Sequence, residues 1–330
     1  MIGRTNVGGG GSRSTIIVTA PTGSTVLLHG PSGARAAGER NGTWIFFGVD
    51  NGTWQVTASR NGQTAARTIT LTRMEVVYIT LNYNTVPEFT YTGDFEIVDD
   101  DDNPITTSQG DWKIRFLTSG TLTFTNLNGA GNGIDVFAVG AGGSGGVRSS
   151  SAQGYGAGGG GGYTQTERGV ELSPGVAYEI VIGSGGAESN SVAGNQGGAT
   201  SGFGVTANGG FGSKQGTSSG NVAGGNGGSG GGAGAANYSN GPNAGGTDGG
   251  DGVGSEGNYG IGQGTTTREF GEADAKLYAT GGTGGVNAVP KSGGDNTGDG
   301  GEGCNAAKSK TSGAGGSGIV IIRNHREGAA

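Results

Sequence analysis

Glycine is the feature that most constrains this chain. The sequence of 330 residues contains 81 glycines, and from residue 140 to residue 318 glycine dominates together with small polar residues and alanine. Such a segment has little apolar surface to bury, and ordering it costs a large loss of backbone entropy. With only 7 prolines and no strict Gly-X-Y repeat, the sequence is not collagen-like. The region must therefore stay disordered or find order without an apolar core.

Three stretches of ordinary strand sequence interrupt the glycine region and favour order. They read "YTQTERGVELSPGVAYEIVIGSGG", "REFGEADAKLYATGG" and, at the close, "GIVIIR". A disordered tail does not need an apolar strand at its far end, whereas a sheet that begins before the glycine would need this last strand to complete it. We therefore predict that strands of one domain hold the glycine region in place.

Extended left-handed helices offer glycine a route to order. These helices have three residues per turn and direct their backbone N–H and C=O groups outward. Where side chains are absent, such helices can pack together and bond to one another, which satisfies buried backbone groups. We predict that residues 140–318 form a bundle of these polyglycine II helices. Six aromatic residues are predicted to cap the bundle or to present a surface: Tyr155, Tyr163, Phe203, Phe211, Tyr238 and Tyr259.

The part of the chain before the glycine has the pattern of a small β-sandwich. Between residues 15 and 83, short runs rich in Val, Ile, Thr and aromatic residues alternate with turn sequences such as "TGS", "NG" and "DNG". This spacing is typical of antiparallel sandwiches. The predicted core residues are Trp44, Phe46, Trp54, Val56, Ile69, Leu71 and Val77.

The predicted fold class is all-β, since no amphipathic helix of useful length occurs in the chain. The predicted domains are a flexible Gly/Ser leader at 1–14, a small Ig-like β-sandwich at 15–85, and a third part at 86–330. In this last part, a jelly-roll-like sheet clamps the polyglycine II bundle.

The stretch "IDVFAVGAGGSGG" has the form of a dinucleotide-binding turn, because Gly140, Gly142 and Gly145 show the spacing G-x-G-x-x-G after an apolar strand. That turn needs a following helix whose N-terminus receives the phosphate. No helix pattern follows here, and Glu167, at a suitable distance for a ribose contact, lies in a strand-like stretch. We therefore expect no nucleotide and no other cofactor.

The acidic run Asp99, Asp100, Asp101 and Asp102 leaves two interpretations open. Carboxylate oxygens suit Ca²⁺, but the run lacks the glycine and the closing acid of a recognised calcium loop, which favours a solvated turn. The single Cys304 excludes an internal disulfide and is expected to be a free thiol without a role.

Charge and motifs exclude several classes of function. The formal net charge is -7 and the basic residues are scattered, which argues against nucleic-acid binding. The N-terminus lacks the apolar stretch of a signal peptide and no window resembles a membrane span, so we expect synthesis in the cytoplasm and no membrane insertion. The two histidines, His29 and His325, lie near opposite ends, and G-x-S-x-G, H-E-x-x-H and P-loop motifs are absent. We expect no catalytic residues and no enzyme.

Several stretches taken together resemble a known family. "GIDVFAVGAGGSGG", "ELSPGVAYEIVIGSGG" and "GAGGSGIVIIR" are similar to the glycine-rich domain of bacteriophage and prophage tail-fibre or adhesin-type proteins. Residues 15–83 resemble a β-sandwich of the PEGA or carboxypeptidase-regulatory type. The glycine-rich part is also similar to that of receptor tyrosine kinases of the anaplastic lymphoma kinase family, in which a jelly-roll-like sheet supports polyglycine helices.

The resemblance implies a protein of the virion, made in a bacterial host. Its implied partners are other virion proteins and a bacterial surface glycan or protein, and it also implies assembly as a homo-oligomer, a trimer. Phage adhesins of this type carry their specificity in loops at the bundle tip. The corresponding loops here are 236–244, 255–261 and 286–297, and the candidate receptor-binding residues in them are Tyr238, Asn240, Asn243, Tyr259 and Lys291.

Two functions therefore stay open. The first is a fibre or adhesin that recognises a bacterial surface through loops of the glycine-rich domain. The second is a purely structural capsid or tail decoration protein, such as a head fibre, without receptor binding. A glycan-degrading tail enzyme is disfavoured, because long glycine tracts hold a catalytic arrangement poorly.

Overall fold

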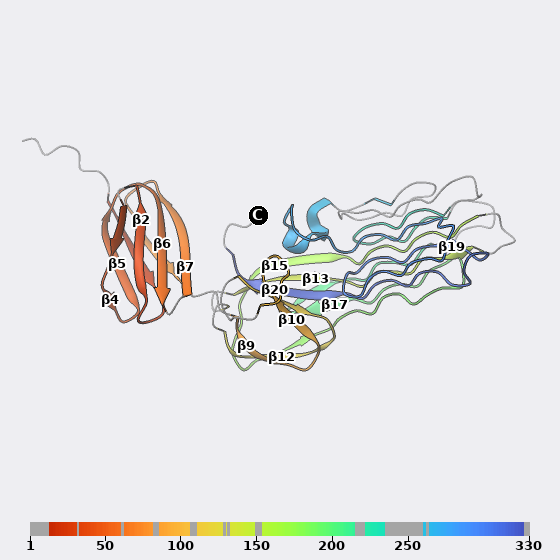
Figure 1. Cartoon of the computed structure of the whole chain (residues 1–330), viewed down its shortest axis with the longest axis horizontal. Coiled ribbons are helices and arrows are strands. Elements are labelled where there is room, and N and C mark those ends of the chain that lie inside the picture. The colour runs from red at the N-terminus through yellow and green to blue at the C-terminus, as the bar shows by residue number, and fades with distance from the viewer. Residues whose placement is uncertain are drawn as a thin grey trace, which may run out of the picture. The chain divides into compact units, whose positions relative to one another are not determined.

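The computed structural model describes residues 13–31, 33–60, 63–81, 86–105, 111–127, 130, 133–148, 154–214, 222–234, 260–261 and 264–326. These residues form strands, extended glycine segments and two short 3-10 helices, with no α-helix among them. The prediction of an all-β fold is confirmed. The chain divides into two compact units, Met1–Val86 with Thr107–Gly110, and Pro87–Thr106 with Asp111–Ala330 (Figure 1). Within the described part of the chain, no helix has the length and hydropathy needed to cross a bilayer.

The first unit is a sandwich of two four-stranded sheets. One sheet has the order β4-β5-β1-β8, formed by Glu39–Arg40, Thr43–Val49, Ser14–Thr19 and Val76–Thr80. The other has the order β3-β2-β6-β7, formed by Gly33–Ala36, Thr25–Gly30, Gly52–Arg60 and Gln63–Leu71. Alternate residues of both sheets meet in one apolar core. Of the predicted core residues, five are buried and Ile69 and Val77 are partly buried at its margin.

The second unit begins with two sheets. The five-stranded sheet has the order β10-β11-β20-β13-β15, formed by Phe95–Val98, Lys113–Phe116, Ile319–Asn324, Ile134–Val139 and Thr164–Val170. The three-stranded sheet has the order β16-β12-β9, formed by Ala177–Ile180, Gly120–Asn126 and Glu88–Tyr91. Rings of the two sheets pack edge to face, as Tyr91 does on Phe116 with centroids 4.9 Å apart.

The last strand of the chain lies inside the five-stranded sheet, as the sequence predicted. β20 is hydrogen-bonded to β11 on one side and to β13 on the other, and all residues of β13 and β20 are buried. The remaining elements are short: the parallel pair β14 and β19 (Val147–Arg148 and Cys304–Asn305), the hairpin β17 and β18 (Thr200–Gly202 and Val205–Ala207), and the 3-10 helices η2 and η3 (Gly264–Thr267 and Glu269–Gly271).

Beyond the five-stranded sheet, extended glycine segments run side by side (Figure 1). Residues 140–146 continue directly from β13. Their N–H groups reach three neighbours in rotation: residues 140, 143 and 146 bond to segment 157–163, residues 141 and 144 to segment 195–198, and residues 142 and 145 to segment 313–316. Bonds to one neighbour thus recur every three residues, which is the period of a polyproline II-type helix.

The carbonyl groups of residues 140–146 reach three further segments, so that among the described residues this helix has six neighbours. Residues 143 and 146 accept from segment 301–304, residues 141 and 144 from segment 210–213, and residue 142 from Gly186. Segment 157–163 is a second central helix of the same kind. The bonding pattern is that of the predicted polyglycine II bundle, in which backbone groups replace an apolar core.

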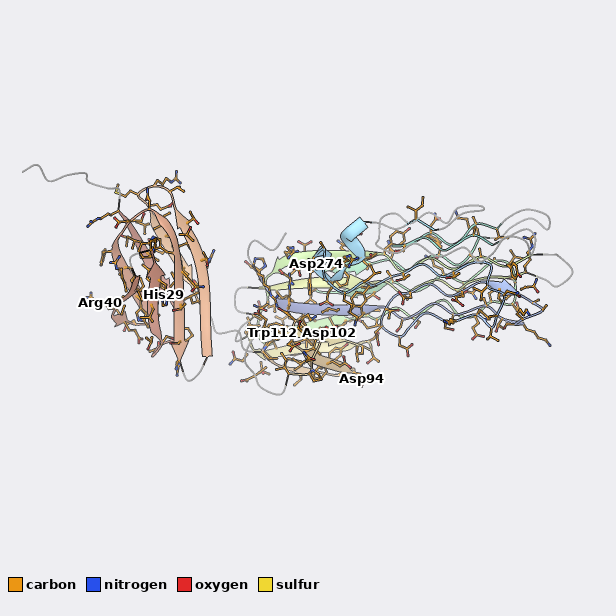
Figure 2. All side chains as sticks on the ribbon, turned by 45° about the horizontal axis from the view of Figure 1, so that its top comes forward. His29, Arg40, Asp94, Asp102, Trp112 and Asp274 are labelled. Carbon is orange, nitrogen blue, oxygen red and sulfur yellow. The ribbon has the colours of Figure 1, made fainter. Side chains whose placement is uncertain are left out.

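The close approach of these helices explains the glycine. A Cβ atom added to Gly142 would overlap the carbonyl oxygen of Asp299, one added to Gly161 would overlap that of Ala279, and one added to Gly162 would overlap that of Gly140. Side chains accordingly gather around the sheets, and few project from the bundle (Figure 2). The bundle is therefore possible only with glycine at these buried positions.

Candidate functional site

The glycines of the dinucleotide-like motif belong to the bundle. The N–H groups of Gly140, Gly142 and Gly145 donate to the carbonyl oxygens of Tyr163, Gly316 and Gly313, at N···O distances of 2.9, 2.9 and 3.1 Å. Each of the three N–H groups that would face a pyrophosphate is thus already bonded to the backbone. Glu167 lies on β15, opposite Val136 of β13.

The acidic run forms a turn whose carboxylates point to different partners. Asp99 Oδ1 accepts the backbone N–H groups of Asn103 and Asp101 at 2.8 and 2.9 Å, and the bond from Asn103 above all holds the pKa of Asp99 below its ordinary value. Asp100 pairs with Arg326 at 2.7 Å, and Asp102 pairs with Lys113 at 2.7 Å. The turn is ion-paired rather than simply solvated. In the part of the chain that the structure describes, no group of His, Cys, Asp or Glu side chains is arranged to hold a metal ion.

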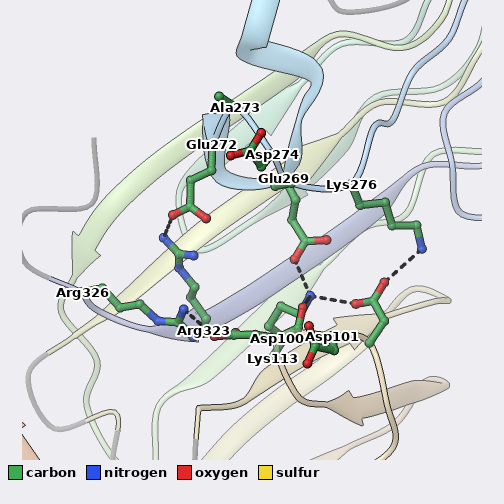
Figure 3. Close-up of a pocket in the computed structure, with 12 residues that line it drawn as sticks. Asp100, Asp101, Lys113, Glu269, Glu272, Ala273, Asp274, Lys276, Arg323 and Arg326 are labelled. Carbon is green, nitrogen blue, oxygen red and sulfur yellow. Dashed lines mark hydrogen bonds and ion pairs between the residues drawn. The ribbon is translucent and has the colours of Figure 1, made fainter.

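These ion pairs line a pocket of the second unit (Figure 3). The pocket has a volume of about 530 Å³ and lies between the acidic turn, β11, β20 and the segment that follows η3. The lining residues are Asp100, Asp101, Asp102, Lys113, Glu269, Glu272, Ala273, Asp274, Ala275, Lys276, Arg323 and Arg326.

Lys113 is a buried cation of this pocket. Its ammonium group bonds to Asp102 at 2.7 Å and to Glu269 at 2.9 Å, and both Lys113 and Glu269 are buried. Burial alone would lower the pKa of Lys113, but the two carboxylates raise it above its ordinary value. The same contact lowers the pKa of Asp102 against the effect of its own burial. Removal of Lys113 would leave the buried carboxylate of Glu269 without this cation, so the contact is a strong constraint on structure.

A second ionic cluster surrounds Asp135 on β13, whose side chain is completely buried. It bonds to Arg323 at 3.2 Å, to Arg168 at 3.4 Å and to Nδ1 of His325 at 2.7 Å. Arg323 continues to Glu272 at 2.6 Å, and its guanidinium lies 4.1 Å from the ring centroid of Phe270. This cluster joins β20, β13 and β15, whereas the Lys113 cluster joins β11 to the acidic turn and η3.

Sequence reasoning missed both clusters. Asp135 is the one polar residue of the strand "IDVFAV", which is the signal that marks it. Lys113 and Glu269 lie on segments far apart in the sequence, and neither residue has a local pattern that points to the other.

Of the candidate receptor-binding residues, only Lys291 lies in the described part of the chain; Tyr238, Asn240, Asn243 and Tyr259 lie outside it. Lys291 is exposed, and its backbone exchanges hydrogen bonds with Glu302. Val286, shortly before it, is bridged to Cys304 of β19, at the end of the bundle away from the five-stranded sheet (Figure 1). The segment that carries Lys291 therefore begins near that end.

The predicted loop 286–297 is shorter than the sequence suggested. Gly293 donates to Ala314 at 2.9 Å, and the Asn296 amide donates to Leu117 at 2.7 Å, beside the five-stranded sheet. Residues 291–294 thus run back along the bundle, because their backbone groups bond to neighbouring helices whatever their side chains are. The exposed residues of this range are 287–289, 291, 292, 294 and 295.

A smaller pocket lies on the wall of the bundle, where three outer helices meet. It has a volume of about 360 Å³ and is lined by Gly194, Gln196, Phe211, Gly212, Lys214 and Asn226. Phe211 is 46% exposed. Its backbone N–H donates to Asn226 at 2.8 Å, and the preceding Gly210 accepts from Gly197 at 2.9 Å, so the three helices are direct neighbours. Phe211 was predicted only as one of six aromatic residues that cap the bundle or present a surface.

A family model described as a glycine-rich domain matches residues 117–325, which include the bundle and the strands from β12 to β20. No curated protein matches the chain.

Proposed function

Because the chain belongs to the glycine-rich domain family, and because its bundle is a frame held by backbone bonds, we propose that it is a virion-associated fibre or adhesin that recognises a bacterial surface. The observation that carries this proposal is the pair of central helices, each bonded to neighbours all around. A frame of this kind leaves the outer positions and end turns free to vary without loss of order.

The phage context of this proposal rests on the order of the sequence motifs, which resemble those of phage and prophage fibres. Its partners would be other virion proteins and a bacterial surface glycan or protein. The ion-paired sheet would hold the bundle, and exposed residues at its far end, such as Lys291, would face the receptor. Trimer assembly remains a prediction from the resemblance.

The test is binding of the fluorescently labelled full-length protein to a panel of intact Gram-positive and gut bacteria. We expect binding that is restricted to some strains, and we expect antibodies against the protein to label the particle and to reduce adsorption. Failure to bind any strain, together with the absence of label on particles, would refute the proposal.

One observation favours a structural decoration protein as the second candidate. The outer face of the sheet β4-β5-β1-β8 exposes Phe47, Val76 and Tyr78, by 67, 55 and 75%. An apolar face of this kind suits attachment to another protein of a particle. Label on the particle without any effect of the antibodies on adsorption would favour this second function over the first.

A further inference from the structure

We propose that the wall of the bundle holds a saccharide-binding site at Gln196, Phe211 and Asn226. This inference rests on the proposed function, because it names the ligand class and a place of contact for the same binding role. It differs from the end loops in position, since it lies along the side of the outer helices. It can also be tested separately from the end loops, because its side chains lie in the described part of the chain.

The three residues form a row because the helices repeat every three residues. On segment 208–214 the exposed side chains stand at every third position, namely Asn208, Phe211 and Lys214. Gln196 is exposed on one neighbouring helix, and Asn226 is half-buried on the other. Gln196 and Asn226 therefore lie on the two helices that flank Phe211, and both line the same pocket as its ring.

The floor between these side chains is bare backbone. A Cβ atom on Gly194 would overlap the carbonyl oxygen of Ser144, and one on Gly212 would overlap the backbone of Gly194. Packing thus demands glycine there, which leaves a shallow space beside the ring. The pocket volume of about 360 Å³ falls within the ~300–1,000 Å³ range of small-molecule sites.

The chemistry of the row matches a sugar. A sugar ring presents C–H groups on its faces and hydroxyl groups at its edges. An exposed aromatic ring can pack against such a face, and a side-chain amide offers two N–H donors and one oxygen acceptor to hydroxyl groups. Among the described residues, the Gln196 amide and the Lys214 ammonium have no hydrogen-bond partner. The polar groups can thus meet a ligand, and Lys214 also admits sugars that carry a carboxylate.

The test uses the full-length protein and a fixed set of oligosaccharides. The probes are tetramers of N-acetylglucosamine, of galactose and of alternating glucuronate and N-acetylglucosamine. Their binding is measured by calorimetry and saturation-transfer NMR. We expect at least one probe to bind, and we expect F211A to weaken that binding at least tenfold and Q196A to weaken it several-fold. F211W, which keeps an aromatic ring, should retain most of the affinity.

The matched control is V176A, because Val176 is also 46% exposed in the same unit and lies away from the pocket. It should leave binding unchanged, and all variants should keep the circular dichroism spectrum and unfolding temperature of the parent. If the parent binds none of the probes, or if F211A binds as the parent does, the saccharide site is refuted. Strain-restricted cell binding would still support the proposed function in that case, so the two failures are distinguishable.

Discussion

Asp135 on β13 lies directly opposite Arg323 on β20, with Nε of the arginine 3.2 Å from a carboxylate oxygen. Both side chains are almost completely buried, and nearly the whole glycine bundle lies between them in the sequence. The first and the last strand that border the bundle are thus joined by a charged contact inside one sheet. Breaking a buried pair of this kind is strongly destabilising, because the remaining charge stays in the protein interior without water or its partner.

We therefore expect Arg323→Ala to lower the free energy of unfolding of the glycine-rich unit by about 3–5 kcal/mol. Because Arg168 and His325 remain beside Asp135, we expect a loss of stability near the lower end of this range. Guanidinium unfolding of the full-length protein, followed by circular dichroism, measures the loss.

The double variant Arg323→Ala with Asp135→Asn is the internal control. It should lose less stability than the sum of the two single variants, because the unpaired charge is removed together with its partner. Strict additivity of the two losses would contradict the role given to this pair.

Asp102 should make stability depend on acid pH. Its pKa is held below the ordinary value of 3.8, because the contact with Lys113 outweighs the effect of burial. A lowered pKa in the folded state means that the stabilisation is complete above about pH 5 and is lost as the pH falls below 3.8 toward the folded-state pKa.

Unfolding midpoints measured between about pH 7 and pH 2 test this linkage. Asp102→Asn should unfold at lower denaturant than the parent at pH 7 and should lose less stability on acidification. Asp101→Asn is the matched control, since the described residues offer the side chain of Asp101 no ion pair. A parent and an Asp102→Asn variant with parallel pH profiles would show that the contact is not coupled to folding.

The parts of the fold that sequence reasoning reached are those with local signals. The apolar run "IVIIR" predicted a closing strand, and "TWIFFGV" and "TWQVTASR" placed Trp44 and Trp54 in the sandwich core. The parts that it missed depend on distant partners or on the backbone. Lys113 meets Glu269 only because β11 lies beside β20, and residues 291–294 join the bundle through backbone groups that any sequence carries.

A three-residue repeat of exposed side chains was nevertheless readable. In "NGGFGSK", Asn208, Phe211 and Lys214 follow one another at every third position, which is the period of one face of a polyglycine II helix. A search for this period would have placed Phe211 on the outer wall before the structure was known.

Cys304 should be unreactive in the folded protein. Burial, with a smaller effect of Glu302, raises the pKa of its thiol to about 11, and its side chain is buried in β19. Since the thiolate is the reactive form, a thiol-specific reagent at pH 7.5 should label the native protein more than tenfold slower than the guanidinium-unfolded protein. Equal labelling rates in the two states would mean that the β14 and β19 end of the bundle opens readily.

The glycine bundle itself gives the most direct prediction. Gly142→Ala and Gly162→Ala place a methyl group on the carbonyl oxygens of Asp299 and Gly140, which belong to backbone already fixed by bonds to several neighbours. Because that backbone cannot yield without breaking other bonds, we expect each variant to lose about 3 kcal/mol or more of stability, or to fail to fold. Gly294→Ala is the matched control, since its methyl group would meet only the side chain of Thr297, at 3.1 Å. Thermal unfolding of the three variants tests this prediction. If all three have the unfolding temperature of the parent, the helices are not packed as closely as their hydrogen bonds require.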